Sequence, residues 1–184
     1  MTDPGNLLAQ IPTAKKGFPP VHLWNPDFCG DIDMRIARDG TWYYLGTPIG
    51  RKPMVKLFSG IIRRDGDDYF LVTPVEKVGI TVDDAPFVAV SLTVEGQGEA
   101  QRLRFTSNVE DEVVAGKEHP IRVVIDPQTQ EPSPYLLMRN NLEALIHRNV
   151  FYQMVELAVP RQIDGVSWLG VWSDGEFFPI GPEG

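Results

Sequence analysis

The stretch CGDIDMRIARDGTWYYLGTPIGRKP, residues 29–53, predicts the architecture of the first half of the chain. Asp39-Gly40 suits the two central positions of a type I′ hairpin turn, which need positive φ angles that Asp and Gly tolerate. With Arg38 paired to Thr41, apolar side chains alternate onto one face of the hairpin, and charged and aromatic side chains onto the other. The stretch therefore predicts a hairpin with one polar, aromatic face.

The polar face of this hairpin would gather an unusual set of side chains. The first strand contributes Asp31, Asp33 and Arg35, and the second contributes Trp42 and Tyr44. Antiparallel sheets often leave one face in water, where such charges pair with one another. Against that, Trp42 and Tyr44 are large side chains to leave in solvent, which favours a covering element or a ligand.

A helix is expected after the hairpin, because apolar residues recur at helical spacing within residues 54–64. It could begin at Pro48 or at Pro53. We prefer Pro53, because a proline inside a helix costs about 3 kcal/mol. Arg51 and Lys52 then lie at the positive end of the helix dipole, where they suit a bound anion or a nearby aspartate.

Further strands are expected where apolar residues alternate along the chain. They cover residues 69–73 and 77–82 in the first half, and residues 87–94, 103–105, 113–114 and 121–125 in the second. The strands of the second half form a meander, which suits a curled sheet or roll. Residues 126–134 contain three prolines and are expected to form a surface loop.

A second helix is expected at residues 142–157, whose apolar residues give one broad face. Asn140 and Glu143 form a capping-box-like start, and Pro160 ends the helix. Arg148 would lie in this helix, either as an exposed residue or as part of an anion site.

Seven motifs resemble the bacterial domain-of-unknown-function family 1285. They are CGDIDMRI (29–36), DGTW (39–42), GTPIGR (46–51), LVTPVEK (71–77), DDAPF (83–87), LEALIHRNVFY (142–152) and WLGVWS (168–173). The resemblance covers nearly the whole chain from about Pro19. It implies a cytoplasmic proteobacterial protein with a duplicated α+β motif, whose second half is similar to the pleckstrin-homology type of roll. The family has no established activity or catalytic residues, and only a suggested ligand-binding or signalling role.

The expected fold class is α+β, with two small related halves that each contain a curled antiparallel sheet and one main helix. Residues 1–18 form a flexible or extended arm, residues 19–84 an N-terminal α+β domain and residues 85–184 a C-terminal roll-like domain. A final hairpin near Asp174-Gly175 echoes the first one, since both carry aromatic residues and then Pro-Ile-Gly. A duplicated unit creates an interface between halves, where ligand sites are common.

Composition limits the possible partners. The net charge is −8 with no block of Lys and Arg, which argues against general nucleic-acid binding. No apolar run is long enough to span a membrane, and the first residues do not resemble a signal peptide. The single cysteine, Cys29, is expected to be a small buried residue and suits a reducing, cytoplasmic compartment. Three scattered histidines do not form a zinc ligand set.

The leading hypothesis is a non-enzymatic ligand-binding or regulatory module, with a small anionic ligand between the halves. Its cationic residues would be Arg35, Arg51 and Lys52, with Trp42 and Tyr44 stacking on the ligand and Arg148 completing the site. One alternative is an enzyme that uses Asp31 and Asp33 to hold Mg²⁺ on a phosphorylated substrate. Another is an adaptor that binds a protein partner, or a second copy, through the aromatic face. No catalytic residue and no cofactor is assigned.

Overall fold

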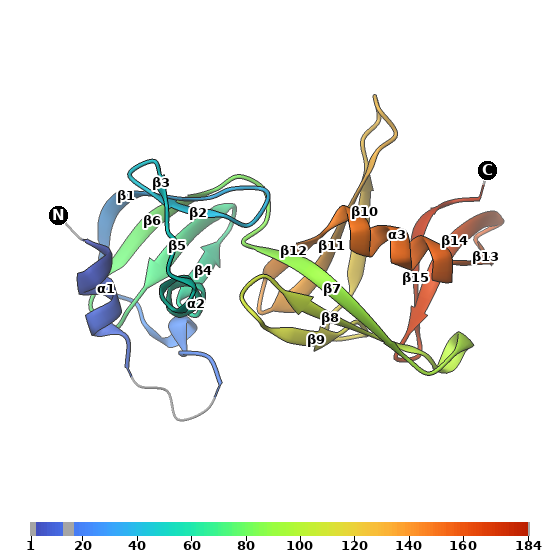
Figure 1. Ribbon diagram of the computed structural model, residues 1–184, viewed down its shortest axis with the longest axis horizontal. Coiled ribbons are helices and arrows are strands. Elements are labelled where there is room, and N and C mark those ends of the chain that lie inside the picture. The colour runs from blue at the N-terminus through green and yellow to red at the C-terminus, as the bar shows by residue number, and fades with distance from the viewer. Residues whose placement is uncertain (1–2, 13–16, 184) are drawn as a thin grey trace. The chain divides into compact units, whose positions relative to one another are not determined.

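The structure is a computed structural model that describes residues 3–12 and 17–183. The chain divides into two compact units, Met1–Asp84 and Ala85–Gly184 (Figure 1). Each unit is built on a six-stranded, curled sheet, and the described residues contain three α-helices. The protein is therefore mostly β.

The first unit carries its strands in the order β3-β2-β1-β6-β5-β4. Its elements are α1 (Pro4–Gln10), η1 (Val21–Leu23), β1 (Phe28–Ile36), β2 (Trp42–Tyr44), β3 (Thr47–Pro48), α2 (Lys52–Ser59), β4 (Ile62–Asp65), β5 (Asp68–Val72) and β6 (Lys77–Val82). Neighbouring strands are antiparallel except β1 and β6, which are parallel. The expectation of a purely antiparallel sheet is wrong at this central pair.

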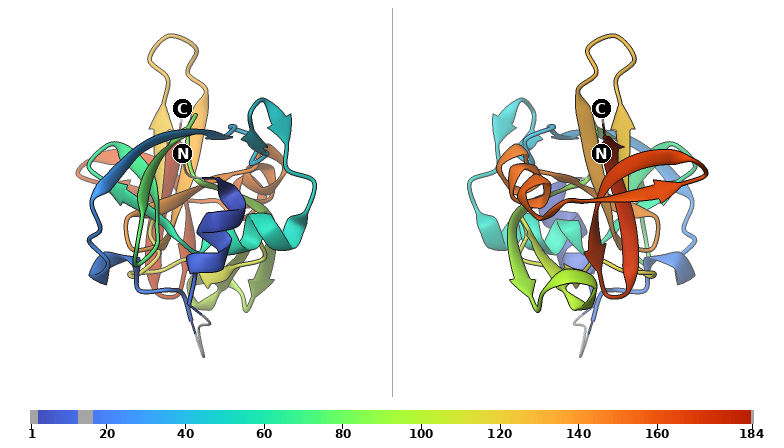
Figure 2. Two further views of the ribbon diagram at one scale, coloured as in Figure 1. Left: turned by 90° about the vertical axis from the view of Figure 1, so that its left-hand side faces the viewer. Right: turned by 90° about the vertical axis from the view of Figure 1, so that its right-hand side faces the viewer.

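The second unit repeats this strand order as β9-β8-β7-β12-β11-β10, again with a parallel central pair. The sheet elements are β7 (Phe87–Glu95), η2 (Gly98–Ala100), β8 (Arg102–Ser107), β9 (Glu112–Val114), β10 (Ile121–Ile125), β11 (Pro132–Arg139) and β12 (Leu142–Ile146). They are followed by α3 (Arg148–Leu157), β13 (Val159–Ile163), β14 (Val166–Ser173) and β15 (Glu176–Pro182). The last three strands form a third sheet, seen in red in the right-hand view of Figure 2.

The register of the first hairpin differs by one residue from the sequence-based prediction. Ile36 pairs with Trp42, and residues 37–41 form the loop, in which the Asp39 carboxylate accepts a hydrogen bond from the Thr41 N–H at 2.9 Å. A one-residue shift moves every side chain to the opposite face. Trp42 is therefore in the core, 2% exposed and stacked on Phe58 at 6.1 Å between ring centroids.

The first predicted helix is confirmed at its start and wrong at its end. Helix α2 begins at Lys52 with Pro53 in its first turn, but it ends at Ser59. Ile61 and Ile62 are buried, and Ile62 begins β4. Their apolar character continues the helical spacing by chance, so the spacing alone could not show where the helix ends.

The second predicted helix is wrong in its first part. Leu142, Ala144 and Ile146 are buried with a period of two, and they belong to strand β12. Asn140 has a φ of 50° in the turn before that strand, so it caps no helix. Helix α3 instead starts after His147, whose side chain accepts a hydrogen bond from the Asn149 N–H.

The other predicted strands are confirmed in position by β5 to β10 and by the final hairpin, whereas β3, β4, β11 and β13 were not predicted. The surface loop expected at residues 126–134 is wrong for its last three residues, because β11 begins at Pro132. Asp174 and Gly175 have φ angles of 50° and 82°, as a type I′ turn requires. The final hairpin lies in the third sheet, and residues 39–50 lie in the first. The two similar sequences therefore form strands of different sheets, at positions that do not correspond.

The N-terminal arm is helical in part. Helix α1 covers seven residues, with Leu7 fully buried. The Thr73 hydroxyl, also buried, donates a hydrogen bond of 2.8 Å to the Gln10 side chain. The expectation of an extended arm is wrong for Pro4–Gln10, and residues 1–2 and 13–16 of that arm lie outside the described residues.

Candidate functional site

A hollow of about 450 Å³ opens on the first sheet, over strands β1, β5 and β6. Its lining combines aromatic rings with ionisable side chains. The lining residues are Phe28, Asp31, Ile32, Asp68, Tyr69, Phe70, Lys77, Gly79, Ile80 and Thr81.

The hollow exists because β1 departs from regular pairing with β6. The register shifts between Phe28 and Asp31 and again between Asp31 and Arg35, and Gly30 has a φ of 98°. Such bulges bend a strand and redirect its side chains. Gly79 faces Asp31 across the pair, and a Cβ on Gly79 would overlap the Asp31 carboxylate. The hollow therefore depends on the missing side chain at position 79.

The unpaired charge in the hollow is negative. Neither the Asp31 nor the Asp68 carboxylate has a hydrogen-bond or ion-pair partner among the residues that the structure describes. The cation, Lys77, already bonds Asp65, with 2.9 Å between the Lys77 Nζ and the carboxylate. The same Nζ lies 4.2 Å from the centroid of the Phe70 ring.

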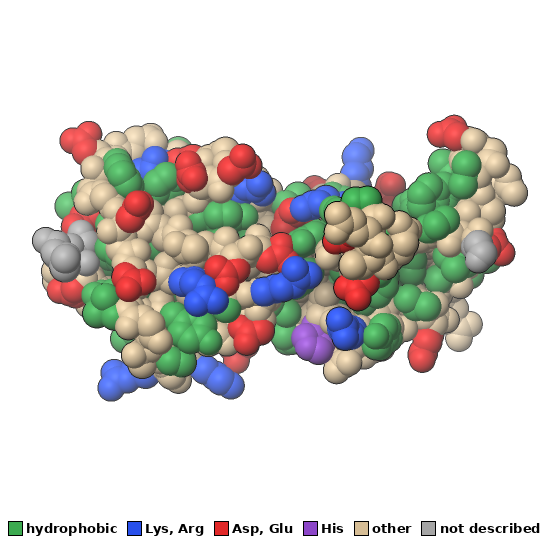
Figure 3. All heavy atoms as spheres, turned by 90° about the horizontal axis from the view of Figure 1, so that it is seen from above, with side chains coloured by type: hydrophobic (Ala, Val, Ile, Leu, Met, Phe, Trp, Pro, Cys, Tyr) green, Lys and Arg blue, Asp and Glu red, His purple; other side chains and the backbone are tan. Residues whose placement is uncertain are grey.

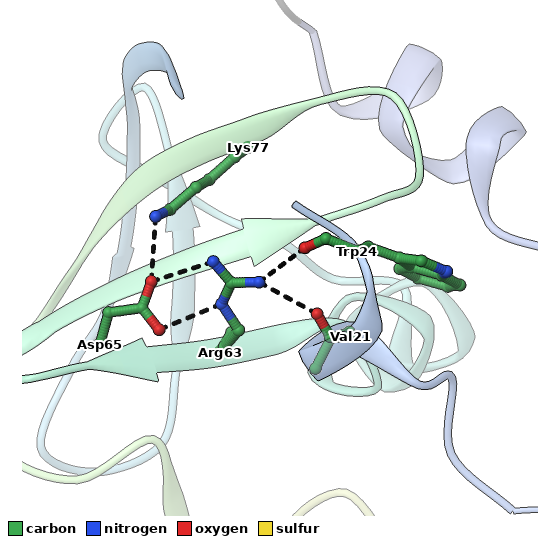
Figure 4. Close-up of polar contacts among 5 residues, drawn as sticks. All are labelled: Val21, Trp24, Arg63, Asp65 and Lys77. Carbon is green, nitrogen blue, oxygen red and sulfur yellow. Dashed lines mark hydrogen bonds and ion pairs between the residues drawn. The ribbon is translucent and has the colours of Figure 1, made fainter. Parts of the chain in front are cut away.

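A largely buried guanidinium, that of Arg63, supports the Asp65 carboxylate that bonds Lys77 (Figure 4). Arg63 donates to the backbone carbonyls of Val21 at 3.0 Å and Trp24 at 2.7 Å, and its other nitrogens bond Asp65 at 3.0 to 3.1 Å. The Arg63 side chain is only 15% exposed. It therefore fastens η1 to β4 and fixes the carboxylate that positions Lys77.

The pKa of Asp65 reflects both burial and this network. Burial raises its pKa, but the hydrogen bonds and charges of Arg63 and Lys77 together outweigh burial, so its pKa lies below the ordinary value. Asp65 is thus the ionised partner of two cations, and it leaves neither of them free to balance Asp31 and Asp68.

Aromatic rings form the apolar wall of the hollow. Phe28 and Phe70 meet edge to face with 5.9 Å between ring centroids, and Phe28 is 56% exposed. The combination of carboxylates and exposed rings can bind an organic cation through charge and through the faces of the rings.

The structure separates the residues expected on one polar face. Asp31 lines the hollow, and Asp33 is exposed on β1 outside the lining. Arg35 makes a bidentate pair with Asp83 at 2.8 to 3.0 Å, whose hydrogen bonds and charge raise the pKa of Arg35. The centroid of the Tyr43 ring lies 5.3 Å from the Arg35 guanidinium. Tyr43 therefore shares a face with Arg35, where the predicted register had placed Trp42 and Tyr44.

The remaining predicted residues lie elsewhere. Trp42 is in the core, and Tyr44 pairs with Met34 on the face opposite Arg35. Arg51 and Lys52 are exposed at the start of α2, and Arg148 is exposed at the start of α3 in the second unit. None of these residues lines the hollow.

Sequence reasoning missed the parts of the hollow that come from β5 and β6. Three of these residues, Asp68, Phe70 and Lys77, are far from Asp31 in the sequence. They lie near it only because their strands pair in the sheet. A glycine inside a strand often marks a close approach, so Gly79 was the one available signal.

Other expectations were also compared with the structure. Cys29 is exposed, and its thiol donates to the Asp27 carbonyl at 3.3 Å, so the expectation of a buried cysteine is wrong. Within residues 3–12 and 17–183, no three or more His, Cys, Asp and Glu residues are grouped so that they could hold a metal ion. Over the same residues, no helix has the length and apolar character needed to cross a membrane. Figure 3 shows acidic and basic side chains interspersed over the face that it presents.

Comparison with known proteins identifies relatives over the whole chain. The family model for the N-terminal domain of DUF1285, a domain of unknown function, matches residues 19–85, and the model for the C-terminal domain matches residues 86–180. A crystal structure of a DUF1285 family protein from Silicibacter pomeroyi DSS-3 is 54% identical, with a TM-score of 0.89 over 99% of this chain and 96% of that one. Another, from Shewanella baltica OS155, is 29% identical, with a TM-score of 0.53 over 67% of this chain and 90% of that one. No curated protein matches the chain.

Proposed function

The chain belongs to the DUF1285 family of proteins of unknown function, and we propose that it is a small-ligand-binding protein whose site is the hollow on the first sheet. The ligand class that fits best is a small organic cation, such as an amine or a guanidine. One observation carries this proposal: Asp31 and Asp68 line a hollow with aromatic walls, and neither carboxylate has a partner among the described residues.

The charged residues of the hollow decide whether its ligand is a cation or an anion. Lys77 is neutralised by Asp65, so an anion entering the hollow would meet two carboxylates without a free cation. A cation would gain from both carboxylates and from the ring of Phe28. The volume of about 450 Å³ is in the range of small-molecule sites.

The earlier hypotheses receive less support from these contacts. An anion on the polar face would depend on Arg35, which is occupied by Asp83, and on Trp42, which is in the core. Binding of an anion by Arg51 and Lys52 stays a prediction, as does an enzyme that holds Mg²⁺ on Asp31 and Asp33. The adaptor hypothesis also stays a prediction.

The broader setting is part of the same proposal. We place the protein in the cytoplasm, supported by its single cysteine, and give it a regulatory role in which ligand binding is the signal. The likeness of the second unit to a pleckstrin-homology roll rests on the family resemblance alone.

Thermal unfolding of the full chain tests the proposal with small amines, quaternary ammonium compounds and guanidines. Carboxylates and phosphates of matched size serve as the comparison, each with and without Mg²⁺. A ligand at a hundred times its dissociation constant adds about 2.7 kcal/mol to the free energy of unfolding. We expect the melting temperature to rise with cations only, and to lose this rise in Asp31→Asn and Asp68→Asn.

Gly79→Ala is the sharpest variant, because the new methyl group would displace the Asp31 carboxylate from its place. We expect its stability to stay within about 1 kcal/mol of the wild type, since a strand accepts alanine, and its binding to be lost. Gly50→Ala is the matched control, because no atom lies within 4 Å of its new Cβ. A shift caused by anions and lost in Arg51→Ala would contradict the proposal, and a shift that needs Mg²⁺ and Asp31 would favour the enzyme.

A further inference from the structure

A second hollow, of about 490 Å³, lies within the second unit between β10 and the third sheet. Its volume is in the range of small-molecule sites. Its apolar lining comes mainly from Val123, Ile125, Ile163, Val166, Trp168 and Pro179. The charged residue among the described residues that line it is Asp164, and none of them is a cation. The hollow is therefore apolar with one negative charge.

The apolar lining on the third sheet forms a continuous strip. Ile163 on β13 pairs with Val166 on β14, so the two side chains project to the same face of the sheet. Trp168 follows two residues after Val166 and shares that face. Val166 is 49% exposed, and Ile125 on β10 is 36% exposed. An apolar body placed in the hollow would remove this surface from water, which is favourable.

The charge at position 164 is not required by the backbone. Asp164 and Gly165 connect β13 to β14 with φ angles of 50° and 79°, as in a type I′ turn. Asparagine tolerates the same conformation, and Asn140 adopts a φ of 50° in the turn before β12. The turn therefore explains a residue of this shape, but it does not explain a carboxylate.

The other turn of the third sheet shows what such a carboxylate usually has as a partner. Asp174 also has a φ of 50°, and its carboxylate lies 3.4 Å from the Arg102 guanidinium. Asp164 has no ion-pair or hydrogen-bond partner among the residues that the structure describes. Its charge would repel an anion in the hollow and attract a cation. The indole of Trp168, in the same lining, is the side chain that attracts cations best.

We propose that the second unit binds an amphipathic cation, with an apolar chain in this hollow and an ammonium group bound by the Asp164 carboxylate. A long-chain alkylammonium ion has this chemistry. The site goes beyond the proposed function, since it lies in the other unit and selects its ligand by an apolar body as well as by charge.

The test measures binding of decylamine to the full chain by titration calorimetry at pH 7, below the concentration at which decylamine forms micelles. Decanol and decanoate serve as probes with the same chain length and a neutral or an anionic head group. We expect decylamine to bind most tightly and decanoate most weakly. Asp164→Asn should weaken decylamine by about threefold or more and leave decanol unchanged, because it keeps the shape of the side chain and removes its charge.

Matched variants separate the head group from the chain. Asp174→Asn removes the other turn carboxylate of the same sheet, one that pairs with Arg102, and should leave decylamine binding unchanged. Val166→Gln changes an exposed apolar residue of the lining and should weaken decylamine and decanol alike. Added salt should weaken decylamine more in the wild type than in Asp164→Asn, because salt screens the attraction between charges.

The hollow on the first sheet is proposed to bind cations too, so each titration is repeated in the Asp31→Asn background. The effect of Asp164→Asn on decylamine should be the same in that background, because the two residues belong to different units. A failure of the proposed function would change the titrations that depend on Asp31 and leave this effect in place.

The proposal is overturned if decanoate binds as tightly as decylamine, or if Asp164→Asn has no effect on decylamine. Equal binding of all three probes would make the hollow a general apolar site and would overturn it too. Concentration-dependent dimerisation that is lost in Val166→Gln, without decylamine binding, would assign the face to a second copy instead.

Discussion

The two six-stranded sheets have the same strand order, but a corresponding row of residues differs in character between them. In the first sheet the row across four strands is Asp31, Gly79, Phe70 and Arg63. In the second sheet the corresponding strands, β7, β12, β11 and β10, carry Val88, Leu145, Tyr135 and Arg122. An arginine paired with an aromatic residue is common to both rows, whereas the central pair is polar and open in one and aliphatic in the other.

This difference explains why the hollow over β1 and β6 belongs to the first sheet. Gly79 leaves room for the Asp31 carboxylate over the sheet, whereas Leu145 places its own side chain at the corresponding position in the second sheet. Val88 is buried at the position where Asp31 lines the hollow. The same topology therefore supports an open hollow or a packed surface, depending on two side chains.

The helices are not part of what the two sheets share. Helix α2 lies between the third and fourth strands of the first sheet, whereas α3 follows the sixth strand of the second. The six-stranded sheet is therefore the element that occurs twice, and each helix is an addition specific to its unit.

The largest expected effect tests whether the two sheets are equivalent in their cores. Leu71 pairs with Ile62 and Leu136 pairs with Ile121, and both leucines are fully buried. We expect Leu71→Ala and Leu136→Ala each to lower the free energy of unfolding of its own unit by about 2–5 kcal/mol. Chemical denaturation of the full chain measures both. A loss below about 1 kcal/mol at either site would show that the corresponding core positions are packed differently.

The second effect separates the two arginines of the row. Arg63 is 15% exposed and donates to two backbone carbonyls, whereas Arg122 is 54% exposed and pairs with the Glu143 carboxylate and the Tyr135 ring. We expect Arg63→Met to cost about 2–4 kcal/mol, because it leaves the two carbonyls without their donor and Asp65 with Lys77 as its remaining cation. Arg122→Met should cost less than about 1 kcal/mol, as exposed ion pairs usually do. Equal losses in denaturation experiments would contradict this contrast.

The sequence predicted most strands but not the register of the first hairpin. Alternation of apolar residues is a local signal, so it located β5, β6 and β10. The register depends on a long-range contact, since burying Trp42 against Phe58 outweighs the preference of Asp39-Gly40 for a two-residue turn. Burial of a large side chain contributes about 1.5–3 kcal/mol, which is more than a turn preference supplies.

The site was less predictable than the strands. Asp31 could be found because it stands in an unusual run of charged residues. Its neighbours Asp68 and Lys77 come close to it only because β1 pairs with β6 in parallel. No local sequence pattern indicates which two strands will pair in this way. The mistaken register placed Trp42 on the polar face and so favoured an anion with aromatic stacking.

The third effect is the pH dependence of the network in the first sheet. The pKa of Asp65 is lowered in the folded state, so its ionised form stabilises the protein above the unfolded pKa of about 4 and this contribution is lost as the pH falls through the folded pKa. Asp65→Asn should cost about 1–2 kcal/mol at pH 7, discounted because Asp65 is partly exposed. Denaturation between pH 7 and pH 2 should show wild type and variant converging at the acid end.

The matched variant for this measurement is Glu143→Gln, which removes the partner of Arg122 in the second sheet. It should cost less than Asp65→Asn at pH 7, because Arg122 is largely in solvent whereas Arg63 is not. A difference between wild type and Asp65→Asn that stays constant down to pH 2 would show that the carboxylate acts through shape and not through charge.

The smallest expected effect concerns the turn between β2 and β3, which has an unusual residue at its first position. Three two-residue turns place Asn140, Asp164 and Asp174 at a φ of 50°, and the turn between β2 and β3 places Leu45 there. Leucine tolerates this region poorly, and Leu45 is also 65% exposed, so neither backbone nor packing favours it. We expect Leu45→Asn to raise the free energy of unfolding by about 0.5–1 kcal/mol, measured by denaturation. Asn140→Leu, the reverse change in the second sheet, should lower it by a similar amount. A loss of stability in Leu45→Asn would show that this leucine makes a packing contact worth more than the strain of its turn.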